Sequence, residues 1–320
     1  MWKSSFEKIV GDAPDESKEQ VMQYFDRVFD NQKSLEGLLE DKEVEKTMDE
    51  IKIISLSNKI TNDLREKYGL PPFDVPFKNI HIVDRKKWSD VLARVKLDRN
   101  VSGFYGGHLQ GIVVKETDSN LETFSLILHE MIHFKSYNAL QIVESKDKSD
   151  KKAKQYRVGL EMRSRRDDNK GYFININEAV TELLTMELMK KNMSNSLFKN
   201  EAEKTKELNK EYYNNLLGDT FLIKIAKLDK ENLFSLTPIK FAYKNERMVL
   251  KELVEKLYEK NSDKFNNFEE VMDLFKEGAI TGNMMKYGRL IDKTFGSGTL
   301  RKIGEFGSDT KSQEDFIKSL

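Results

Sequence analysis

Two histidines and a glutamate are spaced so that they can serve one metal ion. They lie in the apolar run LILHEMIHF as His129, Glu130 and His133. Because residues i and i+4 of an α-helix share a face, both imidazoles can reach one ion while the glutamate points at the water that the ion holds. We therefore predict that the histidines bind a metal and that Glu130 is a general base. The alternative is a helical histidine pair that other hydrogen bonds satisfy.

A catalytic zinc site needs a third protein ligand and keeps one position for water. Cysteine is absent, so histidine and carboxylate are the donors left. His81 and His108 both precede the motif, and Ser136 and Ala139 stand where a metzincin would have glycine and histidine. A carboxylate further along the chain is therefore required. The candidates that fall in predicted loops or at a turn are Glu144, Asp147, Asp150, Glu161, Asp167 and Asp168.

A seventh candidate, Glu178, is expected to open a helix with the sequence NEAVTELLTMELMKK. Glu182 lies one turn further on and therefore shares its face. The helix dipole alone favours a carboxylate in a first turn, so position by itself does not separate a ligand from a structural acid. The two glutamates could also exchange roles.

HEMIH together with NEAVTE resembles the motif pair of the gluzincin zinc metallopeptidases, in which a glutamate from an NE-containing helix completes an HExxH site. The resemblance implies that His129, His133 and Glu178 bind one zinc ion. It also implies that Glu130 is the base and that Glu182 orients a ligand histidine, His129, without touching the metal. The implied fold is a zincin-like core of a small mixed sheet, an active-site helix and a glutamate helix.

The resemblance further implies a tyrosine or histidine, after the two metal helices, that stabilises the oxyanion. No histidine follows His133, so a tyrosine is expected. Tyr243 in FAYKNER and Tyr287 in NMMKYGR are the candidates, although either could be a buried packing residue. Arg247, one turn after Tyr243, could be a second donor or a carboxylate anchor, or it could form a surface ion pair.

Periodicity and turn residues predict the elements before the motif. We expect two or three amphipathic helices from Ser17 to Tyr68, an extended connector at GLPPFDVPF, a strand at NIHIVD and a helix around residues 88–97. The glycines of VSGFYGGHLQGIVVKE predict a hairpin, with an edge strand against which an extended substrate could pair.

The motif helix is expected to begin with a capping box of Ser119 and Glu122 and to continue to Leu140. The lysine-rich segment 144–154 then predicts a loop. Two strands, QYRVGLEMR and GYFININ, should form a hairpin through SRRDDNK and lead into the helix of Glu178.

The rest of the chain predicts charged helices, near residues 197–217, 245–259, 268–275 and 283–292, and glycine turns in FGSGTLRKIGEFGSD. We therefore expect an α+β, mostly helical chain. Its zincin-like core, residues 71–192, should lie between an N-terminal helical region, 1–70, and a C-terminal helical subdomain, 193–320.

Composition excludes several other classes of function. Lysine plus arginine number 54, as do aspartate plus glutamate, so no net charge favours nucleic acid or an anionic membrane. No stretch nears the length of a transmembrane helix, and the N-terminus lacks the apolar core of a signal peptide, so a cytoplasmic protein is expected.

The expected function is zinc-dependent hydrolysis of a peptide or protein, and the oligomeric state is left open. The alternative is a helical interaction protein with a non-catalytic or regulatory zinc site, because much of the chain is charged helix. A third possibility is a structural protein without metal. The presence of Glu130 favours the enzyme, because a structural metal site needs no general base.

Overall fold

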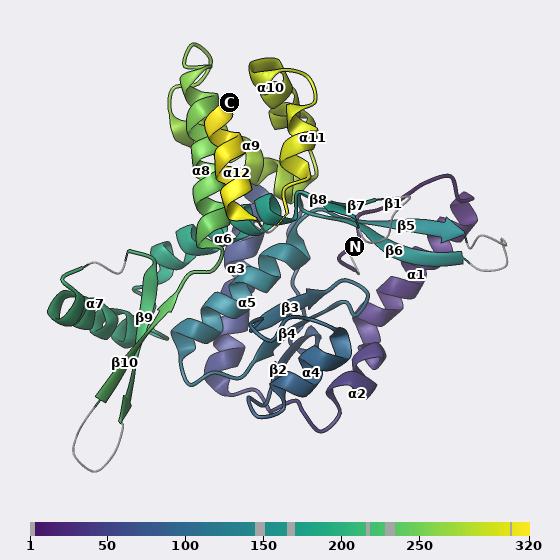
Figure 1. Cartoon of the computed structure of the whole chain (residues 1–320). Coiled ribbons are helices and arrows are strands. Elements are labelled where there is room, and N and C mark those ends of the chain that lie inside the picture. Colours follow the sequence, from purple (N-terminus) through teal and green to yellow (C-terminus); the bar gives the residue numbers. More distant parts are fainter. Residues whose placement is uncertain (1–3, 145–150, 165–169, 216–217, 228–233, 308) are drawn as a thin grey trace.

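A computed structural model of the chain describes all residues except 1–3, 145–150, 165–169, 216–217, 228–233 and 308. Helices account for 55% of the chain, in twelve α-helices within the described residues, and the strands there form three small sheets. The prediction of an α+β, mostly helical chain is therefore confirmed (Figure 1).

The N-terminal region contains the predicted helices and one strand that the sequence did not reveal. The elements are β1 (Lys8–Val10), α1 (Asp15–Asn31), α2 (Lys33–Leu39) and α3 (Met48–Lys67). Thr47 caps α3 in a complete capping box with Glu50. The proline-rich connector then runs without regular structure until a short 3₁₀ helix at Phe77–Asn79, as predicted. A strand of three residues such as β1 is too short to show periodicity, so only its pairing partner defines it.

The first sheet has the order β2-β4-β3, with β2 parallel and β3 antiparallel to β4. Its elements are β2 (Ile80–Val83), β3 (Gly103–Gly106), β4 (Gly111–Lys115) and, between β2 and β3, the helix α4 (Trp88–Val95). Ile80 and Ile112 belong to the main buried cluster, whereas Val83 and Val113 pack with Trp88 of α4. Both faces of this sheet are covered. β3 is an edge strand among the described residues, so the predicted hairpin and edge strand are confirmed.

The motif helix, α5 (Asn120–Lys135), ends earlier than predicted. The side-chain amide of Asn138 donates to the carbonyls of His133, Phe134 and Ser136, which satisfies the last turn and ends the helix. Instead of continuing to Leu140 as a helix, the chain enters the strand β5 (Asn138–Glu144).

Only half of the predicted capping box forms at the start of α5. Ser119 accepts a hydrogen bond from the Glu122 amide, but the Glu122 carboxylate pairs with Lys224 instead of returning to Ser119. Glu201 of α7 (Lys199–Tyr213) takes its place, accepting from the backbone amides of Asn120 at 3.0 Å and Leu121 at 3.3 Å. A carboxylate from a distant helix therefore supplies the negative charge that this N-terminus favours.

The second sheet has the order β1-β5-β6-β7-β8 and is also mixed, because β1 is parallel to β5 and the other pairs are antiparallel. Its remaining strands are β6 (Lys151–Val158), β7 (Glu161–Arg163) and β8 (Gly171–Tyr172). The prediction of a loop over residues 144–154 is wrong for Glu144, which ends β5, and for 151–154, which pair with β5; residues 145–150 lie outside the described residues. Gly159, with φ +55°, splits QYRVGLEMR into two strands by a tight turn.

The glutamate helix, α6 (Ile174–Asn192), begins earlier than predicted, so GYFININ is a strand only at Gly171–Tyr172. Phe173 has φ 59° and donates its amide to the carbonyl of Gly304 at 2.7 Å. This distant contact turns the chain into the helix at Ile174. Glu178 consequently lies in the second turn of α6 and not in the first, so the helix-dipole explanation for its presence does not apply.

The C-terminal part contains the predicted helices and a hairpin that was missed. Its elements are α7, β9 (Thr220–Lys227), β10 (Phe234–Lys240), α8 (Lys244–Glu259), α9 (Phe268–Thr281), α10 (Met285–Phe295), α11 (Thr299–Gly304) and α12 (Thr310–Ser319). The β9–β10 hairpin and α7 project from the body, whereas α8 to α12 gather at the opposite end from the first sheet (Figure 1). The glycine-rich segment includes α11 as well as turns.

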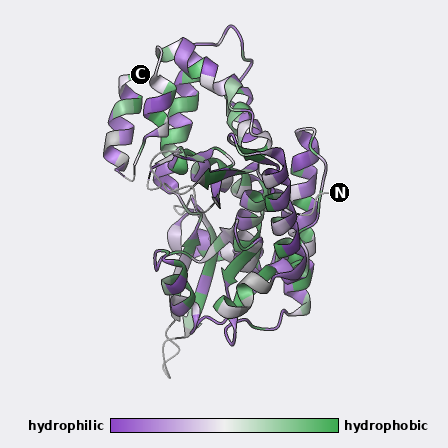
Figure 2. Ribbon diagram, turned by 90° about the vertical axis from the view of Figure 1, so that its right-hand side faces the viewer, coloured by the Kyte–Doolittle hydropathy of each residue, from purple (hydrophilic) through white to green (hydrophobic). Residues whose placement is uncertain are grey.

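One large buried cluster joins the three predicted segments. It runs in sequence from Phe29 in α1 to Ile317 in α12 and includes most of the inward faces of α5 and α6. Hydrophobic and hydrophilic residues accordingly alternate around the helices (Figure 2). The two metal-motif helices therefore lie at the centre of the core, where packing fixes their positions.

A buried cation at the end of α5 gives a test of this packing. Lys135 is 1% exposed and donates to the carbonyl of Asn58 and the side chain of Asn62. Burial lowers the pKa of Lys135 from 10.5 to about 7. Between pH 7 and 10.5, Lys135 is therefore mostly deprotonated in the folded protein and protonated in the unfolded protein. Because the unfolded state binds more protons in this range, the contribution of Lys135 to the stability of the wild type increases as the pH rises.

We expect Lys135→Met to raise the unfolding free energy of the metal-free protein by about 1–3 kcal/mol at pH 7, because an apolar chain replaces a buried cation. The gain should shrink as pH rises towards 10, where the unfolded lysine also loses its proton. Denaturant unfolding at several pH values measures it, with Lys59→Met on the exposed face of α3 as the control. A gain that is independent of pH would contradict the burial of a titrating ammonium.

Candidate metal centre

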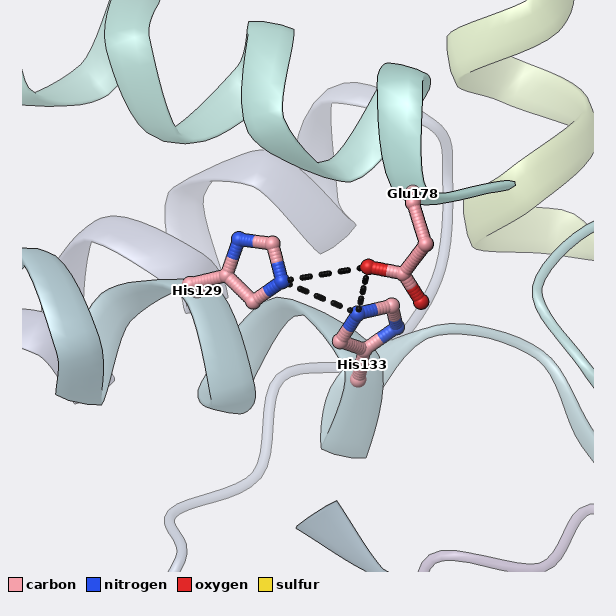
Figure 3. Close-up of side chains that lie close together, drawn as sticks. All are labelled: His129, His133 and Glu178. Carbon is pink, nitrogen blue, oxygen red and sulfur yellow. Dashed lines mark hydrogen bonds and ion pairs between the residues drawn. The ribbon is translucent and has the colours of Figure 1, made fainter. Parts of the chain in front are cut away.

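The structure brings His129, His133 and Glu178 together between α5 and α6 (Figure 3). The two imidazole Nε2 atoms are 3.2 Å apart. Oε2 of Glu178 lies 3.4 Å from Nε2 of His129 and 3.3 Å from Nε2 of His133. Three atoms that each carry a lone pair therefore converge on one point.

These separations fit a tetrahedral zinc ion. With zinc bonds of about 2.0–2.1 Å, the ligand atoms of a tetrahedron are about 3.3–3.4 Å apart. Oε2 of Glu178 is also buried and makes no hydrogen bond of ordinary geometry. Because a buried acceptor without a partner is costly, this atom is placed as a ligand atom would be. Burial raises the pKa of Glu178, but the neighbouring imidazoles outweigh it and hold that pKa well below its usual value.

Glu182 fixes the orientation of His129. Its Oε2 lies 2.7 Å from Nδ1 of His129, and its Oε1 accepts a hydrogen bond of 2.7 Å from the backbone amide of Ala242. If Nδ1 carries the proton that this carboxylate accepts, the lone pair of Nε2 is left for a metal. The structure therefore places Glu178 in the triad and Glu182 behind it.

Glu130 lies in a narrow space under the edge strand β3. Its carboxylate is buried, which raises its pKa, and accepts a hydrogen bond from the backbone amide of Tyr105. A Cβ atom on Gly103 would stand 3.3 Å from Oε1 of Glu130 and 3.2 Å from a methyl of Val114. A residue without a side chain at position 103 therefore lets β3 approach the carboxylate closely.

The structure places one of the two candidate tyrosines at the site. The ring of Tyr243 stacks on that of His129, with centroids 5.9 Å apart, and its hydroxyl lies within hydrogen-bonding reach of Glu178. Burial and the nearby carboxylates raise the pKa of Tyr243, so its hydroxyl stays protonated. Tyr287 is instead fully buried and stacks on Phe275 at 4.6 Å, away from the cavity.

A backbone clamp holds Tyr243 in place. Tyr243 has φ 52°, an uncommon conformation for a residue with a side chain, and immediately precedes α8. Glu182 binds the amide of Ala242, and Arg247 donates to the Ala242 carbonyl at 2.9 Å. Arg247 is 3% exposed and also contacts Asp219 at 3.3 Å, so it braces this turn and is not a surface ion pair.

The remaining histidines serve other purposes. Nδ1 of His81 pairs with Glu43 at 2.9 Å, and the ring is 5% exposed inside the sheet. His108 lies in the β3–β4 turn, against the ring of Phe25. Neither approaches the triad.

Among the other carboxylates proposed as third ligands, Glu161 comes nearest. It lines the cavity beside His133 and Glu178 but pairs with Arg163 at 2.5 Å. Glu144 ends β5, and Asp147, Asp150, Asp167 and Asp168 lie outside the described residues.

Sequence reasoning missed the contribution of Tyr105 and the clamp role of Arg247. Tyr105 acts through its backbone amide, which no motif reveals, and only its place in a glycine-flanked strand, GFYG, pointed to a close approach. The role of Arg247 depends on the β9–β10 hairpin that brings Asp219 to it.

No protein-family model, curated protein or solved structure matches this chain. The helices of the described part of the chain include none that is long and apolar enough to cross a membrane.

Metal titration separates the two glutamates of α6. Glu178→Ala should remove zinc binding almost completely, because it deletes one of three convergent ligand atoms. Glu182→Ala should weaken zinc affinity by roughly 10- to 100-fold, because His129 loses its orienting partner but keeps its lone pair. Competition with a chromophoric chelator measures both variants against the wild type, and the opposite ranking would move the third ligand to Glu182.

Proposed function

We propose that this protein is a zinc-dependent peptidase of gluzincin type that uses one Zn²⁺ ion. The observation that carries the proposal is the separation of 3.2–3.4 Å among the ligand atoms of His129, His133 and Glu178. A structural zinc site is closed by four protein ligands, whereas the described part of the chain offers three here, beside a cavity. An arrangement with one free position suits catalysis.

Each group around this position has a defined task. When bound, zinc lowers the pKa of a water molecule towards neutrality and polarises the scissile carbonyl. Glu130 would accept a proton from the attacking water while the oxygen of that water forms a bond to the carbonyl carbon. Glu130 then passes the proton to the nitrogen, the C–N bond breaks, and an amine and a carboxylate leave. The backbone amide of Tyr105 donates a hydrogen bond to the Glu130 carboxylate and so fixes its position.

Tyr243 is the proposed donor to the oxyanion. Its pKa is raised, so the hydroxyl remains protonated, and the residue lines the cavity together with His129. The clamp around Ala242 holds the backbone just before it. A preorganised donor of this kind lowers the barrier without reorganising during the reaction. Tyr287, which is buried elsewhere, has no such task.

The alternative is an interaction protein with a non-catalytic zinc site. The hairpin with α7 is the feature that favours it, because this arm projects from the body and could contact a partner (Figure 1). The position of Glu130 in the cavity favours the enzyme, since a scaffold has no use for a buried carboxylate beside an open metal position.

Replacing the base gives the first test of this proposal. Glu130→Gln should keep one equivalent of zinc and lose essentially all peptidase activity, because the amide is nearly isosteric but cannot accept a proton. Metal content and hydrolysis of a fluorogenic peptide library would be measured on the same preparations. Undiminished activity in a zinc-loaded variant would exclude the mechanism.

Removing the hydroxyl of Tyr243 gives a second test of the proposal. Tyr243→Phe should lower kcat by roughly 100- to 1000-fold with little change in KM, because the donor acts chiefly on the transition state. Tyr287→Phe is the matched control and should leave kcat within twofold, since that hydroxyl has no hydrogen-bond partner and lies away from the cavity. Equal effects of the two substitutions would remove Tyr243 from the mechanism.

A further inference from the structure

The hollow around the candidate centre extends in two directions. One cavity, of about 280 Å³, continues past His133 to β6 and β7, where Arg157 and Glu161 line it. A second, of about 540 Å³, continues past His129 to the base of the β9–β10 hairpin, where Phe221 and Ile239 line it. Both cavities are lined by Val101, Gly103, His129, Glu130 and Tyr243. The two cavities therefore adjoin at these five residues, and we refer to the two together as the cleft, with the proposed catalytic groups between its halves.

The edge strand β3 lies along this cleft, and some of its backbone amides and carbonyls do not pair with β4. Lys115 donates its amide to the carbonyl of Ser102, so Ser102 belongs to a hydrogen-bonded pair with β4. Because such pairs alternate in an antiparallel ladder, Gly103 and Tyr105 direct their amides and carbonyls away from β4. The Tyr105 amide reaches Glu130, which places this free edge over the base. An extended chain can add to such an edge by main-chain hydrogen bonds.

The charged groups on the β6–β7 side are engaged within the protein. Glu161 forms an ion pair with Arg163 at 2.5 Å. Arg157 keeps its positive charge but directs its donors at backbone carbonyls, of Gly159 at 2.7 Å and Gly282 at 2.8 Å. None of these three side chains is therefore directed at the terminus of a bound chain, so we expect this half of the cleft to hold a continuing backbone.

The hairpin side of the second cavity carries an apolar strip. Phe221 and Ile239 form this strip, and the exposed Lys240 follows Ile239. Polar residues such as Asp98 and Asn100 line other parts of the same cavity. The hairpin is held against the body, since Lys224 pairs with Glu122 at the start of α5 and Thr205 of α7 accepts from the Ile223 amide at 3.1 Å. The strip is thus fixed relative to the metal ligands.

Resting on the peptidase function proposed above, we propose that the substrate is an extended internal segment of a polypeptide, cut away from both ends. Residues on one side of the scissile bond lie between β3 and β6–β7. Those on the other side lie between β3 and the β9–β10 hairpin, with an apolar side chain against Ile239.

Blocked peptides test this directly. A library of dodecapeptides would be prepared with free termini and, separately, with acetylated and amidated termini, and the zinc-loaded wild type would digest both. Mass spectrometry should find cuts at least two residues from either end and rates within twofold for the two libraries. Sequential loss of single residues from one end, or a need for a free terminus, would overturn the inference while leaving the peptidase proposal intact. No Glu130-dependent cleavage of either library would overturn both.

The apolar strip is tested by a matched pair of substitutions. Ile239→Asp should lower kcat/KM at least tenfold for the peptides that the wild type cuts best, because a charge replaces the apolar contact. Ile225→Asp, at an exposed position of β9 outside both cavities, should leave kcat/KM within twofold.

Lys240→Glu, a change at an exposed site that leaves the core intact, should shift the preferred cuts towards peptides with basic residues by at least fivefold. Zinc content and thermal melting would be recorded for each hairpin variant. Equal rates for wild type, Ile239→Asp and Lys240→Glu would remove the hairpin from the cleft.

Discussion

The rest of the candidate centre depends on the two hydrogen bonds that the carboxylate of Glu182 accepts. One oxygen holds the His129 ring on α5 and the other holds the Ala242 amide ahead of α8, while its own backbone belongs to α6. A 3% exposed charge with two strong hydrogen bonds can adopt few other positions, because each alternative would leave a buried polar group unsatisfied. This one side chain therefore links His129, the helix that carries Glu178 and the turn before Tyr243. Its directional hydrogen bonds add to the packing that fixes the helices.

Much of this arrangement could be predicted because its determinants are local. His129 and His133 share a face by helical geometry, Ser119 marks where that helix begins, and the glycines near Gly103 and Gly111 mark the hairpin of the edge strand. The grouping of Glu178 with the two histidines is a long-range feature, and it was predicted because HEMIH and NEAVTE together resemble the gluzincin motif pair. Tyr243 and Tyr287 were both candidates, because no histidine follows His133, and only the fold distinguishes their positions.

The features that could not be predicted are those defined by a distant partner. Nothing near Phe173 indicates that α6 begins at Ile174, because the carbonyl of Gly304 sets that turn. The hairpin β9–β10 was missed because charged residues interrupt its alternation, and the end of α5 was misplaced because Asn138 caps it from within a strand. Local propensity gives way in each case to a contact between segments far apart in sequence.

The bond between Phe173 and Gly304 also sets an order of events during biosynthesis. Roughly 130 residues separate these partners, which at about 5–20 residues per second is a delay of roughly 7 to 26 s on the ribosome. Throughout that interval the nascent chain already carries both histidines and Glu178, yet the start of α6 lacks its anchor and Gly304 is not there to receive the ring of Phe173. The start of the glutamate helix therefore gains its anchor only after residue 304 has been made, so the geometry of the candidate metal centre depends on a segment that is synthesised well after its ligands.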